Sequence, residues 1–430
     1  MFTKVTIPYG HTELSFELPS KNLIKIGSPR DVKCNDVKSL VDYALNNPIG
    51  TGLLNQLISK GQKVAIISDD YTRPTPVKDV MPSLIKQLNE SGISDDDIVI
   101  VVAAGIHREM TSDELTEKLG SNIVKQFRIV QHRSEDESTL EYLGETKAGT
   151  PVWINKDVVA ADFRIGIGMV EAHPYAGFSG GPKIMMPGVA GQKTIFRHHG
   201  FLARSAQSWF GSTQGNPFWE DLKEVAEIGK LNFVVNTVLN GNYEIIKAFS
   251  GEPVKTQEKA IEEFINVYGM ELKEPVDVVI ASANPKHWYF DQSLISILNA
   301  SNIIKDGGSR IIASYCSENL GPGIIRQLYW ESFAREWPSP EEYLQEIVDG
   351  RYDYEMADAP IIYKFFQAAN KSDITLVSCG INPEEIREMR VDWTNDINIA
   401  IEKAFAKNGP DATVAVLPYG GMSYPHISPK

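Results

Sequence analysis

The chain has 430 residues, 42% of them hydrophobic, which is enough for two domains with cores of ordinary size. Its 42 Lys and Arg residues against 56 Asp and Glu residues give a formal net charge of -14, with no basic run. This charge argues against nucleic acid as a partner, because a polyphosphate would be repelled. The three cysteines have no metal-ligand spacing and support neither a disulfide framework nor a cysteine-held metal.

The N-terminus lacks the basic segment and apolar core of a secretion signal. No stretch approaches the roughly 20 apolar residues that span a bilayer. We therefore expect a soluble cytoplasmic protein without a membrane partner.

The first part of the chain predicts a hairpin followed by an α/β domain. Residues 2–19 alternate apolar and polar positions on either side of a central turn, as a β-hairpin does. Short β-branched runs typical of strands buried on both faces then follow at 63–70, 97–105, 126–132 and 161–170. Helix-like segments separate them, and the one over 111–120 begins with a capping box from Thr111 to Glu114. Strands that alternate with helices predict a largely parallel sheet.

A second series of strands begins near residue 275. Its members are expected at 276–284, 309–316, 373–380 and 412–420, separated by helical stretches such as 339–350. A helix-like segment over 256–269 precedes this series, so we place the domain boundary after residue 272. The sequence thus predicts two α/β domains, residues 1–272 and 273–430, each with a mostly parallel sheet flanked by helices.

The loops that follow four of these strands are rich in polar residues. They are "SDDYTRPTP" (68–76), "AAGIHREMT" (103–111), "EAHPYAGFSGGPKIMMPGVAG" (171–191) and "ASANPKHWYFDQS" (281–293). In open α/β sheets, ligands bind beyond the carboxyl ends of the strands. A functional site is therefore expected in these loops.

The glycine-rich loop 171–191 contains a formal G-x-S-x-G match centred on Ser179, the pattern of a hydrolase nucleophile elbow. However, eight residues separate Ser179 from Val170, and Pro182 follows soon after, so the sharp strand-to-helix turn of an elbow is not favoured. A Walker A loop is not matched either. Glycines beside one lysine can bind an anion through backbone N–H groups, or can simply form an exposed turn. They can also let a bulky ligand approach closely.

Four histidines follow strands or this loop. His107 and His173 each lie just past a strand, where imidazole suits proton transfer near neutral pH, although a lone histidine is more often structural. His198 and His199 are adjacent and diverge by about 100° on a helix, so at most one could face a metal. A metal held there would take most of its ligands from something other than the protein.

Asp70 and Arg73 allow two interpretations. They can form a capped turn before a helix, shaped by Pro74 and Pro76. They can also form an anion site, because an Arg fork beside a helix start suits a phosphate or carboxylate.

Taken together, "DDYTRPTP", "GIHREMT", the loop 171–191, "HHG" and "NPKHWYFDQ" resemble the nickel-pincer-dependent lactate racemase family. The motifs keep the family's order and spacing from residue 69 to residue 292, and the closing "LPYGGMSYP" is also similar.

This resemblance implies a cofactor, nickel-pyridinium-3,5-bisthiocarboxylate mononucleotide, which other proteins must make. It implies that Lys183 is joined covalently to the cofactor and that His199 is the protein ligand to nickel. The first domain would then bind the cofactor and carry out catalysis, and the second would close over the substrate cleft. Further cofactor contacts are implied for Asp70, Tyr71, Thr72 and Arg73.

The implied reaction is racemisation or epimerisation of a 2-hydroxy acid by reversible hydride transfer to the pyridinium ring. His107 and His173 match the two catalytic bases, which exchange the hydroxyl proton from opposite sides. Arg73 is also implied near the substrate carboxylate.

One position departs from the family pattern. Lactate racemases of this family supply a Gln and, three residues later, a Lys that help hold the substrate; here Gln292 is followed by Ile295. Residues three apart share a helix face, so an apolar side chain replaces a cation beside Gln292. We therefore expect a substrate other than lactate. Larger or hydroxylated substrates could contact Trp288, Tyr289 and Asp291, or these three could pack at a domain interface.

Two other functions stay open. The protein could be a non-catalytic carrier of the nickel cofactor, although the presence of both His107 and His173 argues against this. A serine hydrolase acting through Ser179 is the third alternative.

Overall fold

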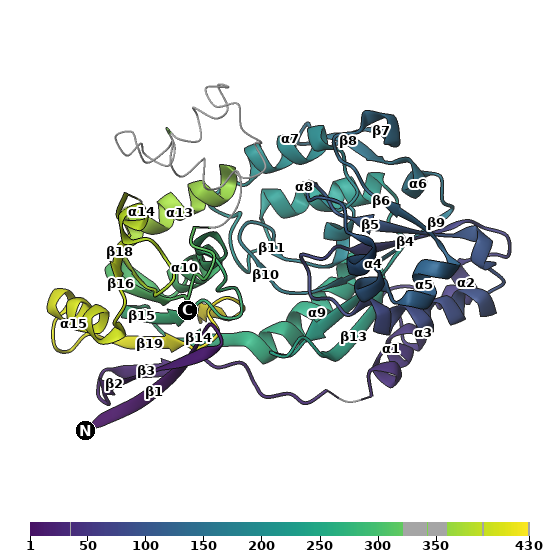
Figure 1. Ribbon diagram of the computed structural model, residues 1–430. Coiled ribbons are helices and arrows are strands. Elements are labelled where there is room, and N and C mark those ends of the chain that lie inside the picture. The colour runs from purple at the N-terminus through teal and green to yellow at the C-terminus, as the bar shows by residue number, and fades with distance from the viewer. Residues whose placement is uncertain (35, 321–341, 343–358, 389–390, 429–430) are drawn as a thin grey trace. The chain divides into compact units, whose positions relative to one another are not determined.

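The structure is a computed structural model that describes residues 1–34, 36–320, 342, 359–388 and 391–428 (Figure 1). It consists of two compact units, one of residues 31–267 and the other of residues 1–30 with 268–430. The helix expected over 339–350 lies outside the described residues except for Glu342.

The unit of residues 31–267 is built on a six-stranded sheet of order β13-β12-β9-β4-β5-β6. All neighbouring strands in it are parallel except the antiparallel pair β12 and β13. Every residue of the central strands β4 and β9 is buried, as the β-branched runs predicted. The strands of this sheet are β4 (Val64–Asp69), β5 (Ile98–Ala103), β6 (Arg128–Gln131), β9 (Phe163–Met169), β12 (Phe233–Leu239) and β13 (Ile245–Gly251).

Helices cover this sheet, and two small β-ribbons extend from it. A single apolar core joins α1 and α3 to the sheet through residues such as Val41, Val77, Leu84 and Ile165. The expected capping box starts α4, where Thr111 Oγ1 accepts from the Glu114 amide at 3.3 Å. The helices are α1 (Val37–Asn46), α2 (Leu54–Leu57), α3 (Val77–Glu90), α4 (Ser112–Leu119), α5 (Ser121–Gln126), α6 (Lys156–Val159), α7 (Gln192–Leu202), α8 (Pro217–Ile228) and α9 (Pro253–Tyr268). The ribbons are β7 (Leu140–Glu145) with β8 (Pro151–Asn155), and β10 (Ala172–His173) with β11 (Gly177–Phe178).

The second unit has a fully parallel six-stranded sheet of order β18-β17-β16-β15-β19-β3. A short parallel pair, β14 (Gly269–Leu272) and β20 (Tyr424–Ile427), accompanies it. The sheet strands are β3 (Leu23–Ile26), β15 (Val276–Ser282), β16 (Ile304–Ala313), β17 (Asp373–Val377), β18 (Asp392–Thr394) and β19 (Val414–Leu417). The helices described are α10 (Phe290–Ser301), α13 (Ala359–Lys371), α14 (Pro383–Glu388) and α15 (Ile397–Asn408).

The N-terminal hairpin is present as β1 (Phe2–Tyr9) and β2 (Thr12–Pro19). Its apolar face, including Ile7 and Phe16, packs into one core with residues of β15 and β19, and β3 then adds an edge strand beside β19. Residues 1–30 therefore belong with the second unit. The division expected at residue 272 had placed them in the first domain. The expected fold class, two α/β parts with mostly parallel sheets and an N-terminal hairpin, is confirmed.

His132 directly follows β6 and is buried, with 1% of its surface exposed. Its Nε2–H donates to the Ala190 carbonyl at 2.9 Å, which ties the sheet to the end of loop 171–191. Burial lowers the pKa of His132 to about 4. The folded protein therefore holds this ring neutral well into the acid range.

We expect the cofactor-free protein to lose stability as the pH falls from 6.5 to 4, since the unfolded chain gains a proton at His132 that the folded state refuses. His132 alone accounts for about 3 kcal/mol of this loss. A His132→Gln variant is less stable at pH 7 but loses less on acidification. Urea unfolding at a series of pH values gives the dependence of the free energy of unfolding on pH for each protein. An equal dependence in the parent and in His132→Gln would contradict the assignment.

Candidate functional site

The carboxyl ends of three neighbouring strands bring the expected loops together. Strands β9, β4 and β5 are adjacent in the sheet and parallel, so the loops after them emerge at one edge. Asp70 directly follows β4, His107 follows β5, and His173 lies on β10 just beyond β9. These three residues therefore belong to one edge of one unit, in loops after strands, where the sequence led us to expect a functional site.

Asp70 and His107 form a hydrogen-bonded pair. His107 Nδ1 lies 2.7 Å from Asp70 Oδ2, and the backbone N and Oγ1 of Thr72 donate to Asp70 Oδ1 at 3.1 and 2.6 Å. Burial alone would raise the pKa of Asp70, but the hydrogen bonds from His107 and Thr72 and the charge of Arg73 outweigh it and lower the pKa. An ionised carboxylate accepts the proton on Nδ1, so His107 presents the lone pair of Nε2.

His107 is accessible while its partner is not. The His107 side chain is 42% exposed and that of Asp70 is 3% exposed. The Tyr71 ring lies edge-on to His107 at 6.5 Å between centroids, and the Arg108 guanidinium lies over Tyr71 at 4.2 Å. A proton acceptor thus faces outward, backed by a buried negative charge.

Lys118 of α4 holds the loop that carries Arg73. Its Nζ donates to the Arg73 carbonyl at 2.7 Å and lies 2.7 Å from Asp69 Oδ1. A cavity of about 290 Å³ opens beside this loop, and the cations that line it are Arg73, Lys78 and Lys118. The Arg73 Nε lies 3.9 Å from Glu171 Oε1 of the glycine-rich loop. This ion pair joins the loop 68–76 to the loop 171–191.

The orientation of His173 is set by backbone amides of its own loop. Its Nδ1 accepts from the N–H groups of Tyr175 at 3.4 Å and Ala176 at 3.2 Å. A ring nitrogen that accepts carries no proton, so the neutral His173 ring has its proton on Nε2. The two histidines at the sheet edge therefore start in opposite tautomers.

Tyr175 lies between His173 and His199. Its ring is edge-on to both, at centroid distances of 4.9 and 5.9 Å. Asn216 fixes the Tyr175 backbone by donating from Nδ2 to its carbonyl at 2.7 Å, while Asn216 Oδ1 caps α8. His173 and His199, which are 26 positions apart, thereby share one aromatic neighbour.

Lys183 lies on the 3₁₀ helix η3 (Gly181–Ile184) with a depressed pKa. Burial lowers the pKa of its amine to about 7, and the positive charge of Arg73 adds to this effect while Glu171 opposes it. About half of the amines are then neutral, and hence nucleophilic, at neutral pH. The positive charge of Lys183 also adds to the lowering of the pKa of His199.

His199 is 7% exposed on α7 and presents one nitrogen to the backbone. Its Nδ1 lies 3.1 Å from the Ile195 carbonyl, which can only accept, so Nδ1 carries the proton. Burial, together with the neighbouring His198 and Lys183, lowers the pKa of His199 well below its usual value. The neutral ring therefore has its lone pair on Nε2, the arrangement that metal-binding histidines use.

Ser179 does not have the surroundings of a nucleophile. Its buried Oγ donates to the Met169 carbonyl and accepts from the Glu171 amide, both at 2.9 Å. No base contacts this hydroxyl among these hydrogen bonds, which connect the loop to the end of β9. The serine thus has a structural role, and the hydrolase alternative loses its basis.

The glycines of this loop serve the packing of the chain itself. Gly177 and Gly180 have φ of +77° and +80°, in the left-handed region that favours glycine. A Cβ on Gly177 would lie 2.3 Å from the Ser212 carbonyl, and one on Gly180 would lie 2.7 Å from Val170 Cγ2. Close approach at both positions is to protein atoms, which corrects the expectation that these glycines make room for a ligand.

Gln292 lies in the other unit, on the first turn of α10. Its Nε2 donates to the Tyr289 hydroxyl at 3.2 Å, while its buried Oε1 has no hydrogen-bond partner among the residues that the structure describes. Ile295, one turn along the same face, is half-buried, and Trp288 is 40% exposed. Asp291 lies on α10, but its side chain is outside the described residues.

Sequence inspection missed three residues of the site. Glu171 is the second residue after a fully buried strand, a position where a carboxylate could have been noticed. Nothing in the sequence of the loop 171–191 distinguishes Tyr175 as a site residue. Asp221 falls on the buried face of α8, three residues after Phe218, and a carboxylate at such a position is an unusual feature of an amphipathic pattern.

Family models and relatives of known sequence match most of the chain. The family model for the lactate racemase N-terminal domain matches residues 9–210, and that for the lactate racemase C-terminal domain matches residues 272–423. The lactate racemase of Lactiplantibacillus plantarum is 29% identical over 426 residues, which cover 97% of this chain and 98% of the relative. The chain belongs to the lactate racemase family. The lactate racemase of Thermoanaerobacterium thermosaccharolyticum is 28% identical over 423 residues, or 97% of each chain.

Solved structures of similar fold support this membership. The lactate racemase apoprotein from Thermoanaerobacterium thermosaccharolyticum is 27% identical, with a TM-score of 0.88 over 98% of this chain and all of the other. A Thermotoga maritima protein shares the fold alone, at 18% identity and a TM-score of 0.69 over 92% of this chain and all of the other. Membership of the lactate racemase family indicates an isomerase of the racemase type. None of the helices in the described part of the chain has the length and apolarity needed to cross a bilayer.

Proposed function

We propose that this member of the lactate racemase family racemises or epimerises a 2-hydroxy acid other than lactate. The reaction would use nickel-pyridinium-3,5-bisthiocarboxylate mononucleotide, supplied by cofactor-biosynthesis proteins and held by Lys183 and His199. The observation that carries the proposal is the joint placement of four groups in one unit: the Asp70–His107 pair, His173, the low-pKa Lys183 and the neutral His199.

The residues present fit this cofactor. Covalent attachment to a lysine needs a neutral amine, and Lys183 has a pKa of about 7. A metal ligand needs an imidazole nitrogen with a lone pair, and the contact to Ile195 leaves that lone pair on Nε2 of His199. The cofactor would supply further nickel ligands of its own, so one protein nitrogen would suffice. Asp70, Tyr71, Thr72 and Arg73 line the adjoining loop and would contact it.

The histidines would handle the hydroxyl proton of the substrate. When bound, the cofactor would accept hydride from C2 of the substrate and return it. His107 Nε2 would take the proton from the hydroxyl of one enantiomer, and the ionised Asp70 would stabilise the imidazolium that forms. His173 would exchange the proton of the other enantiomer and would donate it as an imidazolium, because the neutral ring with its proton on Nε2 can donate only a hydrogen bond. Arg73 would hold the substrate carboxylate through its guanidinium.

The substrate is inferred from the first turn of α10. Ile295 stands where lactate racemases of this family place a cation beside the glutamine. Within the described part of the chain, the buried Oε1 of Gln292 has no hydrogen-bond partner. An unpartnered buried acceptor is costly unless a ligand donates to it. We therefore infer a substrate that offers a hydrogen-bond donor, such as a further hydroxyl, where lactate has only a methyl group.

The test is loss of optical rotation with single enantiomers. Protein co-expressed with the cofactor-making proteins is mixed with lactate and with longer, aromatic and polyhydroxylated 2-hydroxy acids. We expect inversion of at least one member of the panel at a kcat/KM at least tenfold above that for lactate. If protein that carries one nickel per chain inverts none of these acids, the proposed racemase or epimerase activity is contradicted. The non-catalytic cofactor carrier would then be favoured.

An Ile295→Lys variant serves as the matched test of substrate choice. Restoring the cation should raise kcat/KM for lactate relative to the preferred acid, since a charged hydrogen bond contributes roughly 1.5–3 kcal/mol. The control is Ile295→Met, which changes shape but not charge. If the lysine and methionine variants have the same preference, Ile295 does not determine the substrate.

A further inference from the structure

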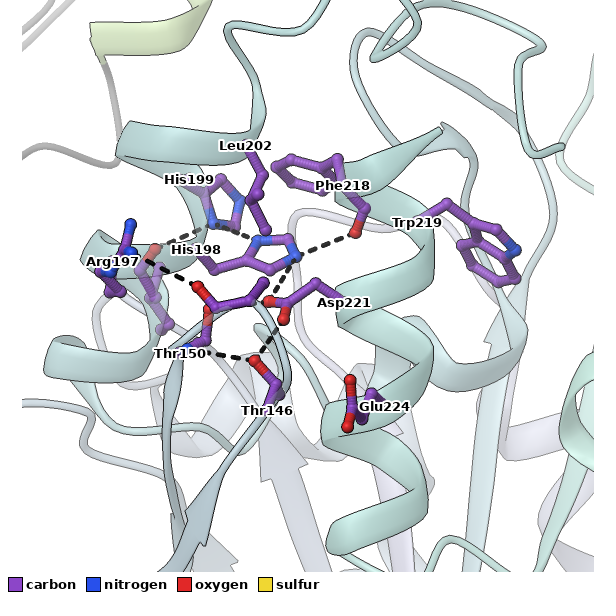
Figure 2. A network of polar contacts seen from close by, with 12 residues as sticks. Thr146, Thr150, Arg197, His198, His199, Leu202, Phe218, Trp219, Asp221 and Glu224 are labelled. Atoms are coloured by element: carbon purple, nitrogen blue, oxygen red, sulfur yellow. Dashed lines mark hydrogen bonds and ion pairs between the residues drawn. The ribbon is translucent and has the colours of Figure 1, made fainter. Parts of the chain in front are cut away.

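His198 is buried immediately behind His199, and no role has yet been given to it. The Nδ1 atoms of the two rings lie 3.4 Å apart (Figure 2). On the far side of its ring, His198 Nε2 lies 3.0 Å from the Phe218 carbonyl of α8. The His198 side chain is fully buried, and its ring contacts that of Phe218 at a centroid distance of 4.0 Å.

These contacts determine which nitrogens carry protons. A carbonyl oxygen only accepts, so the Phe218 carbonyl requires a proton on His198 Nε2, and the Ile195 carbonyl requires one on His199 Nδ1. The facing nitrogens of the two rings can share only one proton, which His199 Nδ1 already supplies. His198 Nδ1 is therefore the acceptor, and His199 donates to two acceptors at once.

We propose that His198 is a positioning residue that, together with the Ile195 carbonyl, fixes the tautomer and ring orientation of His199, so that His199 Nε2 presents its lone pair to the metal. This inference rests on the proposed function, in which His199 is the nickel ligand. The hydrogen bonds all point in one direction. His199 Nδ1–H donates to His198 Nδ1, and His198 Nε2–H donates to the Phe218 carbonyl of α8.

Asp221 supports the same direction. Its Oδ2 lies 3.8 Å from His198 Nε2, too far for a hydrogen bond but close enough to favour a proton on that nitrogen. Thr146 and Thr150 each donate to this carboxylate, the latter at 2.8 Å, and hold it in place (Figure 2). The side chains of His199, Phe218 and Asp221 thus surround His198, together with the Phe218 carbonyl of α8. The polar neighbours in this set are more than a packing role requires.

The tautomer can be measured directly in the cofactor-free protein. Histidine labelled with ¹⁵N is read by two-bond ¹H–¹⁵N correlation, and a His199→Gln variant identifies the His199 signals among the eight histidines. We expect His199 to have its proton on Nδ1 and an unprotonated Nε2. A proton on His199 Nε2 in the parent protein would overturn the proposal, whether or not any variant folds.

Two substitutions separate positioning from packing. His198→Asn keeps an acceptor near the position of Nδ1, whereas His198→Phe keeps the bulk and removes the acceptor. We expect the Asn variant to retain the single tautomer of His199. In the Phe variant the Ile195 carbonyl is the one acceptor left of the two, and we expect His199 to populate both tautomers. The affinity of the loaded protein for nickel should fall about 10- to 100-fold in the Phe variant and less in the Asn variant. A single Nδ1–H tautomer in a folded Phe variant would overturn the proposal.

The outcome is independent of the proposed activity. If His199 shows the expected tautomer but loaded protein inverts no 2-hydroxy acid, the proposed function fails and the proton arrangement stands. If loaded protein is active but the tautomer is the other one, only the role of His198 fails.

Discussion

Replacing Asp70 with asparagine is expected to lower kcat for inversion roughly a hundredfold or more, the usual scale of general acid–base catalysis. The carboxylate holds the proton on His107 Nδ1 and stabilises the imidazolium that forms when Nε2 accepts a proton. An amide at this position can donate as well as accept, so it no longer selects the tautomer and supplies no charge. Measured with saturating cofactor, KM should change little beside the change in kcat.

The separate changes in kcat and KM distinguish this role from a structural one. A disturbed site would raise KM as well as lower kcat, whereas loss of the Asp70 charge alone should lower kcat and leave KM close to that of the parent. Asp42→Asn is the matched control, since Asp42 pairs with Lys38 at the surface of α1. A kcat equal to that of the parent would refute the assignment of Asp70 as the partner of His107.

The loops of the site were predictable from the sequence because parallel strands impose a simple rule. Once β4, β5 and β9 are recognised as buried parallel strands, their following loops must meet at one edge, and that rule places Asp70, His107 and His173 together. The pairing of Asp70 with His107 was not predictable, because it depends on the register of β4 against β5 and on the turn that Thr72 makes. Sequence spacing carries neither quantity.

Other features depend on contacts between distant segments. The N-terminal hairpin packs in the second unit because its apolar face completes a core formed after residue 275, and nothing local to residues 2–19 indicates which sheet they cover. Likewise, the tautomer of His198 depends on the Phe218 carbonyl of α8, twenty residues later in the chain. Helix geometry predicts that His198 and His199 point in different directions, but it could not say which ring faces the backbone of α8.

Lys183→Met is expected to abolish both cofactor attachment and inversion. The thioether has no nucleophilic amine, so intact-mass measurement after co-expression with the cofactor-making proteins should show no adduct, while the parent shows one adduct per chain. Lys183→Arg is the control for charge, because it restores a cation but not a neutral amine and should also remain without adduct. An adduct on either variant would refute attachment at Lys183.

The same substitution should stabilise the cofactor-free protein. Burial lowers the pKa of Lys183 from 10.5 to about 7, so the folded state binds fewer protons than the unfolded state between pH 7 and 10.5, and the parent gains stability as the pH rises through that range. Below pH 7 the parent carries the full cost of a buried ammonium, which methionine lacks. The stability advantage of Lys183→Met in urea unfolding should therefore be largest below pH 7 and shrink towards pH 10.5. A lysine that lowers stability in order to present a neutral amine is consistent with selection for reactivity at this position, and an advantage that does not depend on pH would contradict it.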